Sequence, residues 1–211
     1  MLLADDERAR EVAARAIAAG GVLAFRTDTF YGLGADPFNP HALQKIYAHK
    51  GREEGKPLLV IISDAEVAER LIESQSKLFD AFARRHWPGP ITLVGTSREG
   101  VPRELTAGTG TIGVRLPDDE GVRNFVRAVG GALTATSANP AGQAAARTAR
   151  EVANYFPKGL DLIIDSGPAR GGLPSTVLDV SGPTARLIRE GALMKEELTE
   201  TLRMLDLEMK L

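Results

Sequence analysis

The chain has 211 residues, of which 43% are hydrophobic and 26% charged, with a net charge of −2 and a pI of about 6.0. This composition excludes a disordered protein and a surface built throughout to bind nucleic acid, and the length suits one well-buried domain. The absence of cysteine excludes disulfides, zinc–thiolate sites and cysteine nucleophiles. The N-terminal segment lacks the pattern of a signal peptide and no apolar run approaches membrane-spanning length, so we expect a cytoplasmic protein.

Predicted helices alternate with short apolar strands along the chain. Asp5 or Asp6 can cap a first helix that ends at Gly20, and a buried strand follows at residues 21–26. Residues 57–62, PLLVII, are apolar on both faces, which predicts an interior strand. Further strands are predicted at residues 91–95, 111–116, 132–136, 160–164, 177–180 and 186–189, and further helices at residues 39–47, 65–72, 77–86, 148–156 and 195–211.

These elements predict a single α/β (α+β) domain. Both hairpin-length and helical connections join the strands, which favours a twisted mixed β-sheet with helices packed on it over a purely parallel sheet. No internal repeat or linker divides the chain. We place the main domain at residues 1–195 and a helical tail, packed on it, at residues 196–211.

Two glycine-containing segments suggest phosphate-binding loops, but neither has the residues that such a loop requires. In FRTDTFYGLGAD, residues 25–36, Pro37 occupies the position of the third glycine of a dinucleotide-binding fingerprint. In GREEGK, residues 51–56, three residues rather than four separate the glycines, and Pro57 follows where a Walker A loop has Ser or Thr. We therefore expect the backbone at residues 31–34 to turn closely past a ligand whose phosphates are held elsewhere.

Cations gather at Lys50, Arg52 and Lys56, between a predicted helix and the interior strand. Such a segment can simply be a solvated charged loop. However, ligands of open α/β sheets often bind beside loops in this position, and Lys and Arg together suit polyphosphate oxygens.

The strand TIGVRL carries one cation on its less apolar face. Because side chains alternate along a strand, Ile112, Val114 and Leu116 share one face, while Thr111, Gly113 and Arg115 share the other. An arginine in such a position can be solvated. With small neighbours beside it, this face also predicts the floor of a concave polar cleft with one fixed cation.

Hydroxyl side chains gather at three strand ends, in RTDT at residues 26–29, TATSAN at residues 134–139 and PST at residues 174–176. Each segment alone can be a turn whose side chains bond to their own backbone. Together with the cations, the three segments predict one polar pocket that accepts an anionic ligand.

No nucleophile or protein metal site accompanies this pocket in the sequence. His41, His49 and His86 lack the spacing of metal ligands, and no serine stands in a nucleophile-elbow motif. Cations, hydroxyls and amides without a nucleophile suit reactions that depend on positioning and charge stabilisation, above all phosphoryl or nucleotidyl transfer.

Taken together, these segments resemble the YrdC-like family, the threonylcarbamoyl-AMP synthases. The similarity keeps the same order from about residue 10 to residue 191. Its signature is the pair Lys-x-Arg and Ser-x-Asn, here Lys50/Arg52 and Ser137/Asn139. The segments that carry it are TDTFYGLGAD, KGR, KPLLV, WPGPITLV, TIGVRLP, TSANPAG and PSTVLD.

The resemblance implies a YrdC-like catalytic domain with nucleotidyltransferase activity. Members combine L-threonine, bicarbonate and ATP to give L-threonylcarbamoyladenylate and pyrophosphate. The amine captures CO₂ as a carbamate, whose oxygen attacks the α-phosphate while pyrophosphate leaves. The product is passed to the tRNA threonylcarbamoyl transferase machinery, which modifies the adenosine next to the anticodon. ATP is thus a substrate, and Mg²⁺ is expected to arrive bound to it.

The resemblance also implies roles for individual residues. L-threonine would be held by Thr29, Arg115 and Ser175, with Arg115 pairing its carboxylate. Lys50 and Arg52 would be catalytic, stabilising charge at the phosphates. The ATP-binding residues would be Arg52, Lys56, Thr111, Ser137, Asn139 and Arg189.

The chain departs from the family pattern in three places. Arg26 stands where relatives usually have proline, and its role is open. Ile61 replaces a histidine of many relatives, which removes a polar side chain that could reach threonine. The chain ends at residue 211 without the extra C-terminal domain of longer members, so we expect another segment to close the site, with residues 195–211 as the candidate.

Two other readings stay open beside the synthase. One is a double-stranded RNA or tRNA-binding module of the same fold without synthase activity. The acidic pI argues against strong binding of this kind, because such binding depends on neutralising phosphates. The other is a carbamoyl-adenylate enzyme of hydrogenase maturation, which is disfavoured because those larger chains carry zinc-finger cysteines.

Overall fold

The computed structural model describes residues 1–51, 56–73, 76–204 and 209–210. The helices are α1 (Glu7–Ala18), α2 (Pro40–Lys50), the 3₁₀ helix η1 (Ala65–Arg70), α3 (Lys77–His86), α4 (Arg103–Thr106), α5 (Glu120–Ala128), α6 (Ala149–Tyr155) and α7 (Lys195–Arg203). The strands are β1 (Leu2–Ala4), β2 (Leu23–Arg26), β3 (Tyr31–Gly34), β4 (Val60–Ile62), β5 (Ile91–Thr96), β6 (Thr111–Arg115), β7 (Ala132–Thr134), β8 (Thr136–Ser137), β9 (Leu162–Asp165), β10 (Thr176–Asp179), β11 (Ala185–Arg189) and β12 (Met209–Lys210).

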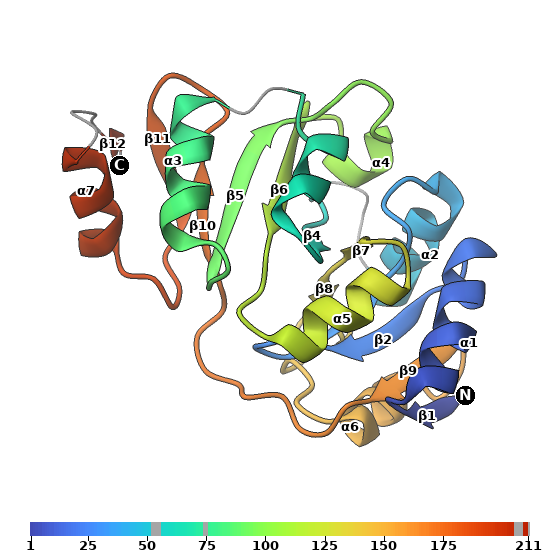
Figure 1. Cartoon of the computed structure of the whole chain (residues 1–211). Coiled ribbons are helices and arrows are strands. Elements are labelled where there is room, and N and C mark those ends of the chain that lie inside the picture. Colours follow the sequence, from blue (N-terminus) through green and yellow to red (C-terminus); the bar gives the residue numbers. More distant parts are fainter. Residues whose placement is uncertain (52–55, 74–75, 205–208, 211) are drawn as a thin grey trace.

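The predicted mixed α/β class is confirmed, with the strands divided between two sheets (Figure 1). The five-stranded sheet, called sheet A here, has the order β1-β9-β2-β3-β8. The seven-stranded sheet B has the order β12-β11-β10-β5-β6-β4-β7. Both sheets contain parallel and antiparallel pairs. The interior position predicted for residues 57–62 is confirmed, since β4 lies between β6 and β7.

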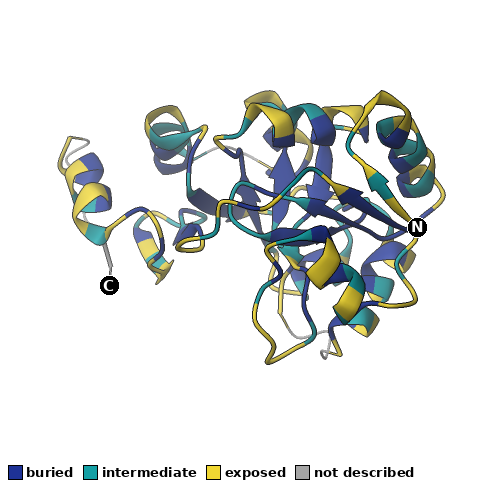
Figure 2. Ribbon diagram, turned by 90° about the horizontal axis from the view of Figure 1, so that it is seen from below, coloured by how far each residue is buried: buried dark blue, intermediate teal, exposed yellow. Residues whose placement is uncertain are grey.

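Sheet A is covered on both faces, as the alternation of its side chains requires. In β2, Leu23 and Phe25 belong to one apolar cluster with residues of α1 and α5, whereas Ala24 belongs to a second cluster with residues of α2 and α6. Strand β9 alternates in the same way, with Leu162 and Ile163 in different clusters. Figure 2 shows this interior as a continuous buried centre beneath exposed helix faces.

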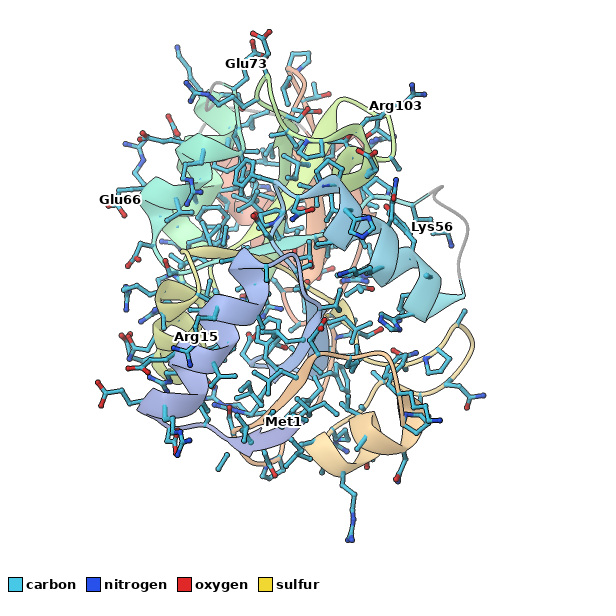
Figure 3. All side chains as sticks on the ribbon, turned by 90° about the vertical axis from the view of Figure 1, so that its right-hand side faces the viewer. Met1, Arg15, Lys56, Glu66, Glu73 and Arg103 are labelled. Carbon is cyan, nitrogen blue, oxygen red and sulfur yellow. The ribbon has the colours of Figure 1, made fainter. Side chains whose placement is uncertain are left out.

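One face of sheet B packs on the large core cluster. The other face packs against α5 at Ile61 and Leu133 and otherwise borders a cavity. Ile112 and Val114 of β6 pack in the large core cluster, which also receives Phe79 and Phe82 of α3. Charged side chains such as Glu66 lie at the periphery of the molecule, outside this core (Figure 3). The opposite face of β6 carries Gly113 and Arg115, so the predicted division of this strand into two faces is confirmed.

The segment YGLG is a strand, β3, rather than the close turn that its glycines suggested. It pairs antiparallel with both β2 and β8. Gly34 is needed for packing, because a Cβ atom there would lie 2.9 Å from Phe25 Cε1. The turn lies earlier, at residues 27–30, where no glycine marks it.

Besides β3, the elements that were not predicted are β1, α4, α5 and β12, and β12 is a strand within the tail that was predicted to be helical. Asp119 caps α5 by accepting a hydrogen bond from Val122 N at 3.1 Å. Helix α5 packs against β4 and β7 and so helps to place the strands around the cavity.

The tail forms helix α7, from which Leu198 and Leu202 enter the core. His86 Nε2 lies 2.8 Å from Thr201 Oγ1, and β12 pairs with β11. The division at residue 195 stays a prediction. Within the described ranges, no helix is both long and apolar enough to cross a membrane.

Candidate active site

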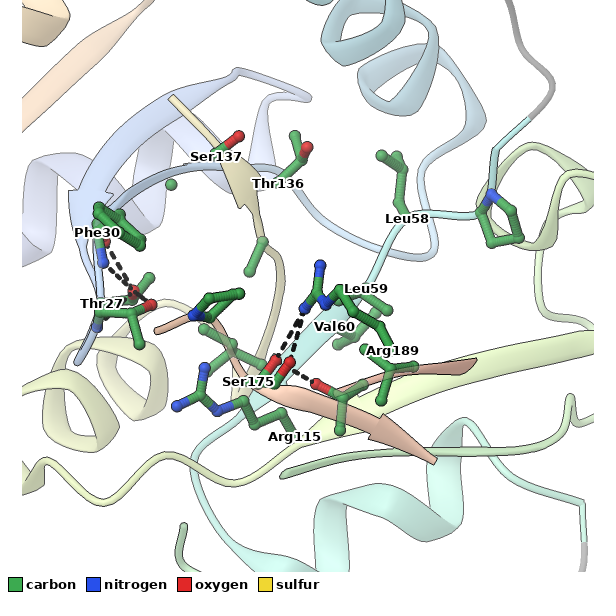
Figure 4. A pocket seen from close by; sticks show the side chains of 18 of the residues that line it. Thr27, Phe30, Leu58, Leu59, Val60, Arg115, Thr136, Ser137, Ser175 and Arg189 are labelled. Carbon is green, nitrogen blue, oxygen red and sulfur yellow. Dashed lines mark hydrogen bonds between the residues drawn. The ribbon is translucent and has the colours of Figure 1, made fainter. Parts of the chain in front are cut away.

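A cavity of about 520 Å³ lies between the face of sheet B that carries Arg115 and the β3–β8 side of sheet A. Figure 4 shows Ser175, Arg189 and Arg115 on one side of it, with Thr136 and Ser137 across from them. Residues from all three hydroxyl-rich segments line it, as the sequence predicts. The polar lining residues are Thr27, Thr29, Lys56, Thr92, Arg115, Thr136, Ser137, Ser175 and Arg189.

Arg115, at the end of β6, is held by Asp28. Its Nη2 donates to Asp28 Oδ2, and its Nε donates to the Gly89 carbonyl at 3.3 Å. The two charged side chains are only 7% and 9% exposed. Burial raises the pKa of Asp28, which the charge of Arg115 opposes. Burial likewise lowers the pKa of Arg115, against the attraction of Asp28. The hydrogen bonds to Asp28 and Gly89 thus fix the Arg115 guanidinium at the cavity wall.

Ser175 precedes β10 and stands in a short chain of hydrogen bonds. Its hydroxyl lies 2.9 Å from Thr92 Oγ1 of the adjacent β5, and both residues are buried. Arg189 of β11 donates through Nη2 to the Ser175 carbonyl at 2.8 Å, and burial lowers the pKa of this guanidinium. These bonds place a second cation and a hydroxyl on the same side of the cavity as Arg115 (Figure 4).

Thr27 organises the turn that carries Thr29 to the cavity. The Thr27 hydroxyl donates to the Phe30 carbonyl at 2.7 Å and accepts from the backbone N–H groups of Thr29 and Phe30, both at 3.3 Å. This is the local side-chain bonding typical of threonine in turns. It brings Thr29 to the cavity and Asp28 to Arg115.

Arg26, which the sequence left without a role, forms an ion pair behind this turn. Its Nη1 lies 3.1 Å from Asp119 Oδ2, and the two side chains are 17% and 8% exposed. Because Asp119 also caps α5, the pair joins the end of β2 to the start of that helix. Arg170 Nη2 lies 3.9 Å from the same carboxylate.

Six of the predicted site residues line the cavity together. They are Thr29, Lys56, Arg115, Ser137, Ser175 and Arg189.

The remaining predicted site residues do not line the cavity or are not described. Lys50 and Asn139 are buried beneath the segment that carries Ser137. Thr111 is at the opposite end of β6 from Arg115, beside Thr109. Arg52 lies outside the described residues.

Two contributors, Asp28 and Thr92, were missed in the sequence. Thr92 carried a usable signal, because it is the polar residue inside the apolar strand segment PITLV. Asp28 lies in a recognised segment, but its partner is 87 residues away, so its pairing depends on the tertiary fold.

Comparison with known proteins relates the chain to one family. The family model described as "Telomere recombination" (Sua5_yciO_yrdC) matches residues 15–191. A threonylcarbamoyl-AMP synthase of Pyrococcus abyssi is 36% identical over 191 residues, covering 90% of this chain and 56% of the relative. A threonylcarbamoyl-AMP synthase of Idiomarina loihiensis is 38% identical over 163 residues, covering 75% of this chain and 87% of the relative.

Solved structures relate the chain to the same family. P. abyssi Sua5 complexed with L-threonine superimposes with a TM-score of 0.88 at 35% identity, covering 96% of this chain and 59% of that one. Escherichia coli YciO, with a TM-score of 0.81 at 24% identity, shares the fold. The chain therefore spans little more than half of the P. abyssi protein and most of the I. loihiensis one.

Proposed function

The chain belongs to the Sua5/YciO/YrdC family, and from this we propose that it makes L-threonylcarbamoyladenylate and pyrophosphate from L-threonine, bicarbonate and ATP. The observation that carries the proposal is the cavity itself, where the buried, Asp28-paired Arg115 shares one space with Lys56 and Arg189. Such a set of cations suits a ligand pair that brings both a carboxylate and a polyphosphate.

In this proposal, L-threonine binds at the end of the cavity formed by Arg115, Thr29 and Ser175. The carboxylate pairs with Arg115, whose guanidinium is already oriented by Asp28 and the Gly89 carbonyl. The hydroxyls of Thr29 and Ser175 supply neutral hydrogen bonds, and Ile61, a cavity residue in register with Arg115, adds apolar surface. The structure of P. abyssi Sua5 complexed with L-threonine supports L-threonine as the ligand.

ATP binds along the remaining wall. Lys56, Ser137 and Arg189 face the cavity, and in this proposal they contact the nucleotide. Thr111, Asn139 and Arg52 complete the proposed ATP set. Of these, Thr111 and Asn139 are off the cavity wall, while Arg52, with its proposed role at the phosphates, lies outside the described residues.

The proposed chemistry needs orientation and positive charge rather than a protein nucleophile. The threonine nitrogen bonds to CO₂ derived from bicarbonate, and the resulting carbamate oxygen bonds to the α-phosphorus while the bond to pyrophosphate breaks. Fixed cations lower the barrier because negative charge builds on the phosphate oxygens in this step. The product would pass to the machinery that modifies tRNA, in the cytoplasm.

Mg²⁺ fits this site as a companion of ATP. Among the described residues, no three His, Asp or Glu side chains converge on one point. A Mg²⁺ ion would therefore depend on phosphate oxygens for most of its ligands, as is common for this metal. When bound, it would neutralise phosphate charge.

The test is pyrophosphate release by the purified chain with ATP, Mg²⁺ and bicarbonate. We expect release only when L-threonine is added, and not with L-valine, which lacks the hydroxyl. Release that does not depend on threonine, or none under any condition, would contradict the proposal. A gel shift with double-stranded RNA at physiological salt and without nucleotide tests the RNA-binding alternative.

A further inference from the structure

Lys50 is the last residue of α2, and its ammonium group is buried inside the neighbouring loop. The residue is 5% exposed. Its Nζ donates to the Asn139 carbonyl at 2.6 Å and the Ser137 carbonyl at 2.7 Å. Ser137 Oγ and Asn139 Oδ1 follow at 3.3 Å each. A buried ammonium is tolerated only where its donors are satisfied, and these four oxygen atoms satisfy them.

The number of donors limits what else Lys50 can do. An ammonium has three N–H groups. The two short bonds to carbonyls use two of them, and Ser137 Oγ and Asn139 Oδ1 are acceptors within reach of the third. Lys50 could donate to a phosphate only by releasing one of these oxygen atoms.

The loop is bonded to Lys50 from both sides. The Lys50 carbonyl, at the C-terminus of α2, accepts from Ala141 N at 3.2 Å. Asn139 in turn donates through Nδ2 to the carbonyls of Pro140 at 3.0 Å and Gln143 at 2.7 Å. Lys50 and Asn139 therefore form the inner support of the loop, and Ser137 is the member that reaches the cavity.

We propose that Lys50 is a positioning residue, which fixes the backbone of Ser137 so that the Ser137 hydroxyl can bind the nucleotide, and that Lys50 does not contact the phosphates. The β8 strand is short: its register with β3 spans Gly32 and Leu33, and Ala138 N adds one bond to the Tyr31 carbonyl at 2.8 Å. The two carbonyl bonds from Lys50 hold the same segment from the side of α2. The inference rests on the proposed function, since it assigns a role within ATP binding.

The experiment is a double-mutant cycle on ATP affinity, measured by calorimetry without threonine, with Lys50→Met, Ser137→Ala and both changes together. We expect each single change to weaken binding about tenfold or more, the loss typical of a hydrogen bond to a charged group. If Lys50 acts through Ser137, adding Lys50→Met to Ser137→Ala costs little more. If the loss of ATP affinity in the double variant equals the product of the two single losses, Lys50 contacts the phosphates independently of Ser137, and the positioning role is overturned.

Lys50→Arg is the matched control because it keeps the positive charge but replaces the compact ammonium with a planar fork. If Lys50 is a positioning residue, Lys50→Arg weakens ATP binding as much as Lys50→Met does. ATP affinity near that of the unchanged protein in Lys50→Arg would show that charge alone suffices. Thermal unfolding checks both variants, and loss of the folded state in both would make Lys50 a purely structural residue. Failure of the unchanged protein to bind ATP would instead contradict the proposed function.

Discussion

The Arg115–Asp28 pair shows how a single side chain is prepared for a ligand at some cost to folding. Burial raises the pKa of Asp28 and lowers the pKa of Arg115, so it favours the neutral form of each partner. The cost of desolvation therefore cancels part of the attraction between the two charges. A pair of this kind is weak evidence for stability. Its value lies in holding the guanidinium in one orientation, which reduces the reorganisation needed when a carboxylate binds.

Replacing one member of this pair should cost more stability per substitution than replacing both members together. We expect Arg115→Met and Asp28→Asn each to lower the free energy of unfolding by about 3–5 kcal/mol, because each leaves a buried polar group uncompensated. The double variant should lose clearly less than the sum, with a coupling of about 1 kcal/mol or more. Urea unfolding at neutral pH measures all four proteins. Strict additivity would show that the two charges are energetically independent.

The same residues set the limit of what could be predicted at this scale. Arg115 was recognised because strand alternation is a local pattern, and Ser137 and Ser175 because hydroxyls end apolar strands. The partner of Arg115 could not be predicted, because the carboxylate lies in a turn 87 residues earlier. Lys50 was recognised as one of the cations that follow α2, but only the packing of α2 on the loop shows where its N–H groups point.

Among the elements, β3 is the most informative difference between sequence and structure. Its four residues include two glycines, so local propensity favours a turn. The strand forms because tight packing against Phe25 requires the missing side chain at Gly34. Helix α5 is the opposite case. Its apolar spacing of Val122, Phe125, Val126 and Val129 is helical and could have been recognised from the sequence alone.

The role assigned to Gly34 can be tested by adding one methyl group. In Gly34→Ala, the new Cβ would meet Phe25 Cε1 at 2.9 Å and Cδ1 at 3.2 Å. We expect a loss of about 1–3 kcal/mol in the free energy of unfolding, as for other overpacked cores. Gly182→Ala is the matched control, because nothing lies within 4 Å of its added Cβ. Equal stability of the two variants would remove the steric explanation for β3.

At the scale of the whole molecule, one of the connections between the two sheets runs beside the cavity and is bonded to the turn before β3. This connection, residues 166–174, leads from β9 in sheet A to β10 in sheet B and is called the strap here (Figure 1). Gly171 N donates to the Thr29 carbonyl at 2.8 Å, and Tyr31 donates through its hydroxyl to the Gly167 carbonyl at 2.7 Å. Pro174 of the strap lines the cavity.

The Tyr31 bond predicts a specific loss of stability in alkali. Burial, with the nearby charge of Asp165, raises the pKa of Tyr31 from 10.0 to about 12. Between these values the unfolded chain loses the proton and the folded chain keeps it. The contribution of this pKa shift to the free energy of unfolding is therefore complete below pH 10. It is lost as pH rises toward 12, by at most about 1.4 kcal/mol per pH unit.

Urea unfolding from pH 9 to 12 measures this dependence. Tyr31→Phe should be less stable by about 1 kcal/mol at pH 9 and should show a shallower decline above pH 10. Tyr155→Phe, which leaves the strap bond intact, should keep the decline of the unchanged protein. Identical pH profiles for Tyr31→Phe and the unchanged protein would contradict the role of this hydroxyl.

The position of β1 at the edge of sheet A has a consequence for protein synthesis. Among the described strands, β1 pairs with β9 alone, residues 2–4 being in register with residues 163–165, so the first strand made has no strand partner until about 160 further residues have been added. At typical rates of translation, that interval lasts roughly 10–30 s. Strand β2 also depends on β9 for one of its two neighbours. Sheet A, and with it one wall of the cavity, is thus completed only late in translation, after most of the chain has left the ribosome.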